Sequence, residues 1–403
     1  MVERARRARG ESGEIRVNGY SEKWLSKGFP WIYPKEVVAG TPAPGESVVV
    51  RGESGAVLGR AIADHGWLAA RVFRSDGEEI DEDLLGGRLG RAAALRDLVV
   101  PAGTTGYRLV NGENDGLPGI RIDWWSHYAV VALDSPSLAG LLPALVEWLQ
   151  VEREPRGIYL VWRPDPRDDR DFSTASQATG LIAGHAPAGD IAVLEGDTRV
   201  DVRLPDAPDV GLYCDMRAVR TWLADYWGGA SVLNLFAFTG VFSVAAARGG
   251  ATDVVSVDLS AAALERATHN FRVNNLDPDR YEFLAEDAFK VLDRYRRTGE
   301  GFDRVILDPP AFSRGPSGIW SGQKDWPRLA AAAARVTNAG GWVIAACNQG
   351  EISPREFRGL VAQGFERAGR SAQLLASLGQ SPDFPASVTF PEGRYLKVDV
   401  YRL

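Results

Sequence analysis

Short apolar runs alternate with amphipathic segments of helical period through residues 206–403. The apolar runs predict buried strands at residues 232–235, 254–257, 281–284, 302–307, 342–346, 371–375 and 396–401. The segments between them predict helices at residues 241–248, 261–274, 288–298 and 325–336. Strands that alternate with helices pair in parallel through right-handed crossovers. This half is therefore predicted to be a Rossmann-like, doubly wound α/β sheet.

Strands dominate the first half of the chain. Within residues 14–80, short strands at 37–38, 47–51, 57–62 and 67–73 are separated by Pro and Gly, which predicts a small β-barrel. The aromatic cluster at residues 29–33 is expected to help close its core. Residues 81–205 combine strands with helices at 81–97 and 138–150, which predicts a small α+β domain with a loop over 164–188. Residues 1–13 are polar and basic and are predicted to be disordered.

The charge distribution favours RNA contacts in the N-terminal part. The 403 residues carry a net charge of −7, yet residues 1–75 hold 12 Lys and Arg against 8 Asp and Glu. A locally positive region on an acidic protein is compatible with an RNA partner. No apolar run approaches membrane-spanning length, so no membrane contact is expected. The two cysteines form no CxxC pair, which favours a reducing, cytoplasmic location, and the four histidines show no ligand-like spacing, so no metal site is predicted.

The stretch 231–258 predicts a nucleotide site. A strand, a turn through Thr239 and Gly240, a small-residue helix and a second strand that ends on Asp258 make up a βαβ unit. Asp258 is placed to accept hydrogen bonds from ribose hydroxyls. Because Phe236 and Phe238 stand where a dinucleotide fold needs glycine, the turn disfavours NAD and an NAD(P) oxidoreductase.

Three acids follow successive predicted strands and should meet at one edge of the sheet. They are Asp258, Asp287 and Asp308. Ligands bind at the carboxyl edge of a parallel sheet, so we expect these acids to bind the ligand, with Asp287 accepting from an adenine amino group. The alternative is that they cap helix N-termini, as Asp often does.

Residues around Asp308 and Cys347 are candidates for binding a planar base and for a reactive thiol. Asp308, Pro309 and Pro310 stiffen the backbone after a buried strand, and Phe312 offers a face on which a base can stack. Cys347 ends the next strand of the predicted sheet, where a thiol could be a nucleophile or an inert core residue. The other cysteine, Cys214, is predicted to be structural.

Residues 14–403 resemble the ribosomal RNA large-subunit methyltransferase I family. The matching motifs are FPWIY (29–33), GENDGLPG (112–119), GLYCDMR (211–217), NLFAFTG (234–240), DPPAF (308–312) and YLK (395–397). The resemblance implies a PUA-like RNA-binding domain, a small α+β domain and a class I methyltransferase domain that uses S-adenosylmethionine (SAM). It also implies 23S rRNA as the RNA partner, and it is compatible with a homodimer.

The resemblance also implies roles for individual residues. The first cofactor loop matches Asn234, Phe236, Thr239 and Gly240. The ribose and adenine contacts match Asp258 and Asp287. The motif that faces the methyl group and the target base matches Asp308 and Pro309, and the family's Asp-x-Arg matches Asp215 and Arg217, near the cofactor's amino-acid end or the RNA. The nucleophile of cytosine-C5 members matches Cys347, whose thiolate would add to C6 of a flipped-out cytosine.

Two departures from the family pattern keep a second chemistry open. Residues 347–349 are Cys-Asn-Gln where cytosine-C5 members have Cys-Ser, and residues 383–385 are Asp-Phe-Pro in place of Asp-His-Pro. Relatives that methylate guanine in 23S rRNA carry Asn residues in the region of Cys347 and Asn348. Cytosine-C5 methylation is favoured, and the alternatives are methylation of a guanine nitrogen and a noncatalytic RNA-binding assembly factor.

Overall fold

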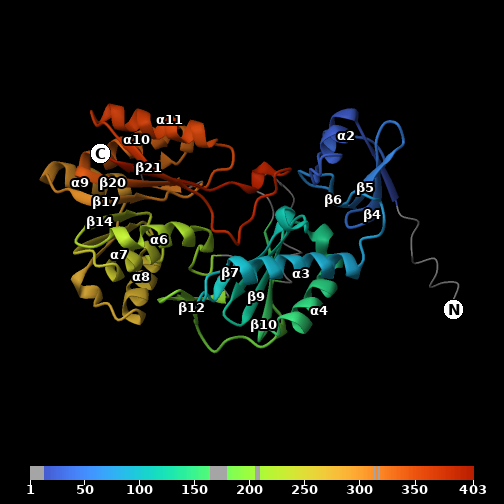
Figure 1. Cartoon of the computed structure of the whole chain (residues 1–403), viewed down its shortest axis with the longest axis horizontal. Coiled ribbons are helices and arrows are strands. Elements are labelled where there is room, and N and C mark those ends of the chain that lie inside the picture. Colours follow the sequence, from blue (N-terminus) through green and yellow to red (C-terminus); the bar gives the residue numbers. More distant parts are fainter. Residues whose placement is uncertain (1–12, 164–178, 205–208, 312–313, 316–317) are drawn as a thin grey trace.

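The computed structural model describes residues 13–163, 179–204, 209–311, 314–315 and 318–403. The predicted disorder of residues 1–13 therefore lies almost wholly outside the described residues. The N-terminal domain occupies one end of the elongated molecule, the central domain lies in the middle, and the C-terminal domain forms the other end (Figure 1).

The N-terminal domain is built on a six-stranded sheet of order β2-β6-β5-β4-β1-β3. Its elements are β1 Gly13–Val17, α2 Gly19–Leu25, β2 Trp31–Ile32, β3 Val37–Ala39, β4 Ser47–Arg51, β5 Val57–Ala63 and β6 Ala70–Arg74. Strand β4 shows the expected alternation, since Val48 and Val50 are fully buried between half-buried neighbours. The four predicted strands are confirmed.

The aromatic cluster 29–33 closes this domain's core only in part. Of its aromatic and aliphatic side chains, Ile32 is the one that joins the core. The rings of Phe29 and Trp31 instead pack against Phe390 of the C-terminal domain, with centroid distances of 5.8 and 4.6 Å. A partner so far along the chain leaves no local pattern, which explains the error.

The central domain has a five-stranded sheet of order β11-β10-β9-β8-β7 with helices α3 and α4 on one face. Its elements are α3 Glu82–Val99, β7 Gly106–Asn111, β8 Ile120–Trp125, β9 Tyr128–Leu133, α4 Leu142–Glu152, β10 Gly157–Trp162 and β11 Gly180–Gly184. The predicted loop over 164–188 is wrong at residues 180–184, which form β11 and pair antiparallel with β10. Residues 164–178 of that loop lie outside the described residues.

A hairpin of β12 Ile191–Glu195 and β13 Thr198–Val202 joins the central and C-terminal domains. Its buried side chains share one apolar cluster with Trp125 and Tyr159 of the central sheet and with Val241 and Phe384 of the C-terminal domain. The domain limits 81–205 and 206–403 remain predictions.

The C-terminal domain is a seven-stranded sheet of order β16-β15-β14-β17-β20-β22-β21. Its elements are α6 Arg217–Leu223, β14 Ser231–Leu235, α7 Val241–Arg248, β15 Asp253–Asp258, α8 Ala261–Val273, β16 Glu282–Ala285, α9 Ala288–Thr298, β17 Phe302–Leu307, β18 Arg314–Gly315, β19 Gly318–Ile319, α10 Gly322–Val336, β20 Thr337–Cys347, α11 Pro354–Arg367, β21 Gln373–Leu378 and β22 Lys397–Arg402. The first five sheet strands are parallel, and β22 is inserted antiparallel between β20 and β21. The doubly wound, mostly parallel sheet is confirmed.

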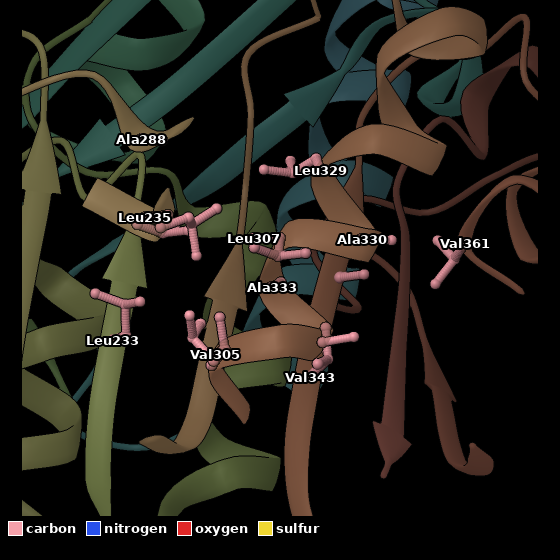
Figure 2. Close-up of a cluster of buried hydrophobic side chains, with 14 of the residues drawn as sticks. Leu233, Leu235, Ala288, Val305, Leu307, Leu329, Ala330, Ala333, Val343 and Val361 are labelled. Atoms are coloured by element: carbon pink, nitrogen blue, oxygen red, sulfur yellow. The ribbon is translucent and has the colours of Figure 1, made fainter. Parts of the chain in front are cut away.

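Both faces of this sheet are buried, which is why its strands appear in the sequence as continuous apolar runs. Successive residues alternate between faces: Val305 and Leu307 pack under α9, α10 and α11, whereas Ile306 packs on the side of α6, α7 and α8. Figure 2 shows the first of these clusters, in which Leu307 lies between strands and the helix that carries Leu329. Burial of each such Leu or Val side chain stabilises the fold by about 1.5–3 kcal/mol.

The connection 379–396 between β21 and β22 reaches out of the C-terminal domain to the other two, and it is drawn in red in Figure 1. The backbone carbonyl of Pro385 accepts a hydrogen bond from Asn111 Nδ2 (2.9 Å), and the backbone N–H of Ser387 donates to Asn114 Oδ1 (2.8 Å). The three domains therefore share specific contacts around this connection.

Candidate functional site

The chain reverses its direction of winding between β14 and β17. From β14 the strands run outward to β15 and β16, and the chain then returns to the other side of β14 for β17 and β20. Ligands of doubly wound sheets bind at the carboxyl ends of the strands at this switch point. The loops that lie there are residues 236–240 after β14 and residues 308–310 after β17.

The loop after β14 has an unusual backbone. Phe236, Phe238 and Gly240 all have positive φ, at 62°, 49° and 71°. A non-glycine residue in this region costs free energy and is found where the fold enforces it, often at ligand sites. Gly240 is required, because a Cβ there would lie 2.7 Å from the Cβ of Ala267. Thr239 anchors the loop by donating from its hydroxyl to the carbonyl of Gly211 (2.6 Å).

Asp258 ties the same loop to the end of β15. Its Oδ2 accepts from the backbone N–H of Phe238 (2.8 Å) and its Oδ1 from that of Ser260 (2.9 Å). Each carboxylate oxygen can accept more than one hydrogen bond, so ribose hydroxyls can still donate to this half-buried group. Helix α8 is capped by Ser260, so Asp258 is not the helix cap.

Asp287 does cap a helix, as the alternative interpretation expected. Its Oδ1 accepts from the backbone N–H groups of Phe289 and Lys290 (3.0 and 3.2 Å) at the start of α9. Its Oδ2 has no hydrogen-bond partner among the described residues and can accept from an amino group. Capping and ligand binding are compatible here.

Asp308 follows β17 directly and carries the most perturbed carboxyl group of this edge. Burial raises its pKa to about 7, the negative charge of Asp215 adds to the rise, and Arg220 opposes it. Within the part of the chain that the structure describes, its carboxylate has no hydrogen bond or ion pair. Pro309 beside it is buried. A carboxylate with a pKa close to neutrality suits a general base.

Asp215 lies near Asp308 and accepts a hydrogen bond from the Tyr395 hydroxyl (2.7 Å). Arg217, two residues on, is not brought to this edge. Its buried guanidinium donates to Asp383 and to the carbonyl of Gly106. The structure thus places Asp215 near Asp308 and places Arg217 away from it. The predicted roles of both residues near the amino-acid end of the cofactor or the RNA stay predictions.

Asn234 also points away from the ligand edge. Its Nδ2 donates to Ser243 Oγ (2.9 Å) of α7, and that hydroxyl is 2.7 Å from Ser256 Oγ of β15. The side chain thus fixes α7 against the sheet. Phe312, which was predicted to stack on a base, lies outside the described residues.

Cys347 ends β20 next to β17, since Leu307 pairs with Ala345 in the parallel register. The thiol is only 2% exposed and packs with Trp326 in the apolar cluster under α10. Burial raises the pKa of Cys347, whereas the backbone of Gln349 and the charge of Lys397 act in the opposite direction. Lys397, the first residue of β22, pairs with Cys347 at the end of β20. It was not identified as a site residue from the sequence.

A cavity of about 470 Å³ opens between this edge and the central domain. Asp215, Ala311, Asn348 and Tyr395 line it from the C-terminal domain. The central domain contributes Arg108, Arg121, Asp123 and Arg163, and Trp31 of the N-terminal domain completes the wall. Its volume falls within the range of about 300–1,000 Å³ that is typical of ligand pockets. No pattern along the chain predicted this cavity, because its lining residues come from all three domains.

The donors and acceptors at the edge suit SAM. Asp258 and Asp287 can accept from ribose hydroxyls and an adenine amino group. The described residues contain no group of three or more His, Cys, Asp or Glu side chains placed to hold a metal ion. No helix in the described ranges is both long and apolar enough to cross a bilayer.

Comparison with known proteins agrees with this geometry. Residues 173–395 match the S-adenosylmethionine-dependent methyltransferase family and residues 15–74 match the PUA-like domain. A protein of Shewanella amazonensis named ribosomal RNA large subunit methyltransferase I is 35% identical over 394 residues, which cover 96% of this chain and 99% of the relative.

Two solved structures share the fold over the whole chain. A methyltransferase complexed with S-adenosylhomocysteine superimposes with a TM-score of 0.87 at 23% identity, covering 97% of this chain and 100% of that one. A protein of Streptococcus mutans described as a SAM-dependent methyltransferase gives 0.85 at 23% identity with the same coverage.

Proposed function

The chain belongs to the ribosomal RNA large subunit methyltransferase I family and is a SAM-dependent methyltransferase, and we propose that it methylates C5 of a cytosine in 23S rRNA. The name of the relatives and the PUA-like domain support the RNA substrate. The observation that carries the chemistry is that Asp308 and Cys347 lie at the same ends of two neighbouring parallel strands. Asp308 directly follows Leu307, and Cys347 comes two residues after Ala345, the residue that pairs with Leu307. When bound, SAM supplies an electrophilic methyl group.

In this proposal the cytosine enters through the interdomain cavity after it leaves the RNA stack. The Sγ of Cys347 forms a bond to C6, and the electron pair of the C5–C6 double bond moves to C5. Once C5 is methylated, Asp308 takes the C5 proton, the double bond returns and the thiolate leaves. The carboxylate pKa of about 7 allows Asp308 to accept this proton at neutral pH.

The burial of Cys347 adds a requirement. In the free protein the thiol is packed against Trp326 and its pKa is raised, so it is almost entirely protonated near pH 7. The proposal therefore requires that RNA binding uncovers the thiol and lowers its pKa. The ammonium of Lys397, which donates to the carbonyl of Gln349, is the cation in place to stabilise the thiolate.

We expect RNA that contains 5-fluorocytidine to trap the enzyme, because C5 then carries fluorine and no proton can be removed. Wild-type protein with SAM should give a protein–RNA adduct that survives a denaturing gel. Cys347→Ala should give no adduct and no methylation, with SAM affinity by calorimetry nearly unchanged. Cys214→Ala, which removes the other buried cysteine, is the matched control and should still form the adduct. Full methylation by Cys347→Ala would contradict the covalent mechanism.

A second candidate is methylation of a guanine nitrogen, and one observation favours it. Asn348, and not Cys347, lines the cavity, and its buried Oδ1 has no hydrogen-bond partner within the described residues. Such an oxygen can accept a hydrogen bond from a base amino group. Under this candidate Asn348→Ala abolishes methylation and Cys347→Ala does not.

A further inference from the structure

A groove between α9 and α10, on the outer face of the C-terminal domain, collects positive charge. Its volume is about 390 Å³. Lys290 and Arg296 line it from α9, and Arg328 and Arg335 line it from α10. The one acid in its wall is Asp293. Four cations against one acid stand out on a chain whose net charge is −7.

The cations of the groove are largely uncompensated. Asp293 is already paired with Arg296 (2.9 Å) and with Arg297 outside the groove (2.6 Å). Arg328 lies over the ring of Phe289 at 3.9 Å, and Arg335 donates to the backbone carbonyl of Arg367. Among the described residues, no acid pairs with Lys290, Arg328 or Arg335. These three exposed side chains are free to meet an external anion.

The charges form a row that leads to the cofactor edge. Lys290 is in the first turn of α9, and its backbone N–H donates to Asp287 at that edge. Arg328 and Arg335 are seven residues apart on α10, about 10 Å at 1.5 Å per residue. A row of separated cations suits an extended polyanion better than a single small anion. The ring of Phe289 is covered by Arg328, so this groove offers no free aromatic face to read a base.

We propose that the α9–α10 groove binds the sugar-phosphate backbone of the RNA strand that carries the target base. This inference rests on the proposed function, since it takes RNA as the substrate. The contacts are to phosphates and therefore set the position of the strand without reading its sequence. The strand would run from the groove across the start of α9 to Asp308.

The test is a triple variant, Lys290→Gln, Arg328→Gln and Arg335→Gln, with binding to a 23S rRNA fragment measured from 50 to 200 mM salt. The slope of log K against log salt is negative. Loss of three phosphate contacts should make it less steep by about 2, at about 0.7 per contact. The affinity advantage of the wild type should then shrink about 20-fold across this salt range. SAM affinity and the kcat at saturating RNA should be unchanged.

The matched control is Arg248→Gln, Arg272→Gln and Arg280→Gln, which removes the same charge from exposed positions outside the groove. It should keep the wild-type slope. If the groove triple behaves like this control, the groove proposal is wrong. If the wild type itself neither binds nor methylates the fragment, the RNA substrate of the proposed function is wrong instead. Lys290→Glu alone, a single exposed change, repeats the test should the triple fail to fold.

Discussion

Replacing Asp308 with asparagine is expected to lower kcat by about 10²–10⁴-fold, the usual contribution of a general base. The amide cannot take the proton from the target base, whereas it fills nearly the same volume. For the wild type, the rate should rise with pH below about 7 and level off above it, because the carboxylate is the active form. The residual rate of Asp308→Asn should lack this rise. Single-turnover methylation between pH 5.5 and 8.5 measures both.

The same substitution should stabilise the free protein. The folded state raises the pKa of Asp308 from the ordinary 3.8 to about 7, so the folded protein holds this proton more tightly than the unfolded chain. Below pH 3.8 both states are protonated and nothing is lost. Between pH 3.8 and 7 the carboxyl group of Asp308 is ionised in the unfolded chain but still protonated in the folded protein. The stability therefore falls as the pH rises. Above 7 the cost is complete, about 4 kcal/mol at most.

In urea unfolding at pH 8, Asp308→Asn should therefore have a higher free energy of unfolding than the wild type. Asp253→Asn, at an exposed position, should change stability little. A variant that loses activity and is also less stable at pH 8 would assign Asp308 a structural role and not a catalytic one.

Replacing Asp383 with alanine is expected to destabilise the protein by about 3–5 kcal/mol. Asp383 is fully buried, and its carboxylate pairs with Arg217 and accepts from the backbone N–H of Arg108 (3.0 Å). Its own carbonyl accepts from Arg96 (2.8 Å) on α3 of the central domain. Burial raises the pKa of Asp383 although Arg217 opposes this, so the pair is costly to bury. Removing one partner leaves the other charge buried and unpaired.

Equilibrium unfolding of Asp383→Ala and Asp383→Asn checks this account. The asparagine variant, which keeps a hydrogen-bond acceptor, should lose less stability than the alanine variant. Asp293→Ala, which breaks a more exposed pair with Arg296 and Arg297, should lower the stability far less than Asp383→Ala does. A loss below about 1 kcal/mol for Asp383→Ala would show that the buried Arg217–Asp383 ion pair and the hydrogen bonds of Asp383 to the central domain contribute little.

The sheet and its ligand edge could be predicted because they follow from local patterns. Strands buried on both faces appear as apolar runs, and the carboxyl ends of parallel strands meet at one edge. That rule placed Asp258, Asp287 and Asp308 at the ends of β15, β16 and β17, where the structure has them, and their roles toward the ligand stay predictions. The loop around Phe236 and Phe238 could be recognised as unsuited to NAD because bulky residues stand where glycine is needed.

Partners far apart in sequence could not be predicted. Arg217 pairs with Asp383, 166 residues away, and the interdomain cavity needs side chains from three domains. Strand β11 was missed because its pairing with β10, and not its own pattern, makes it a strand. The orientation of Asn234 was likewise decided by a hydroxyl on α7 that no spacing rule points to.

The most direct test of the account is the identity of the methylated nucleoside. Unmodified 23S rRNA would be incubated with the purified protein and SAM that carries a deuterated methyl group, then digested and analysed by mass spectrometry. We predict labelled 5-methylcytidine with the wild type, none with Cys347→Ala, and labelling that is about 10²–10⁴-fold slower with Asp308→Asn. Labelled methylguanosine that persists in Cys347→Ala would contradict it.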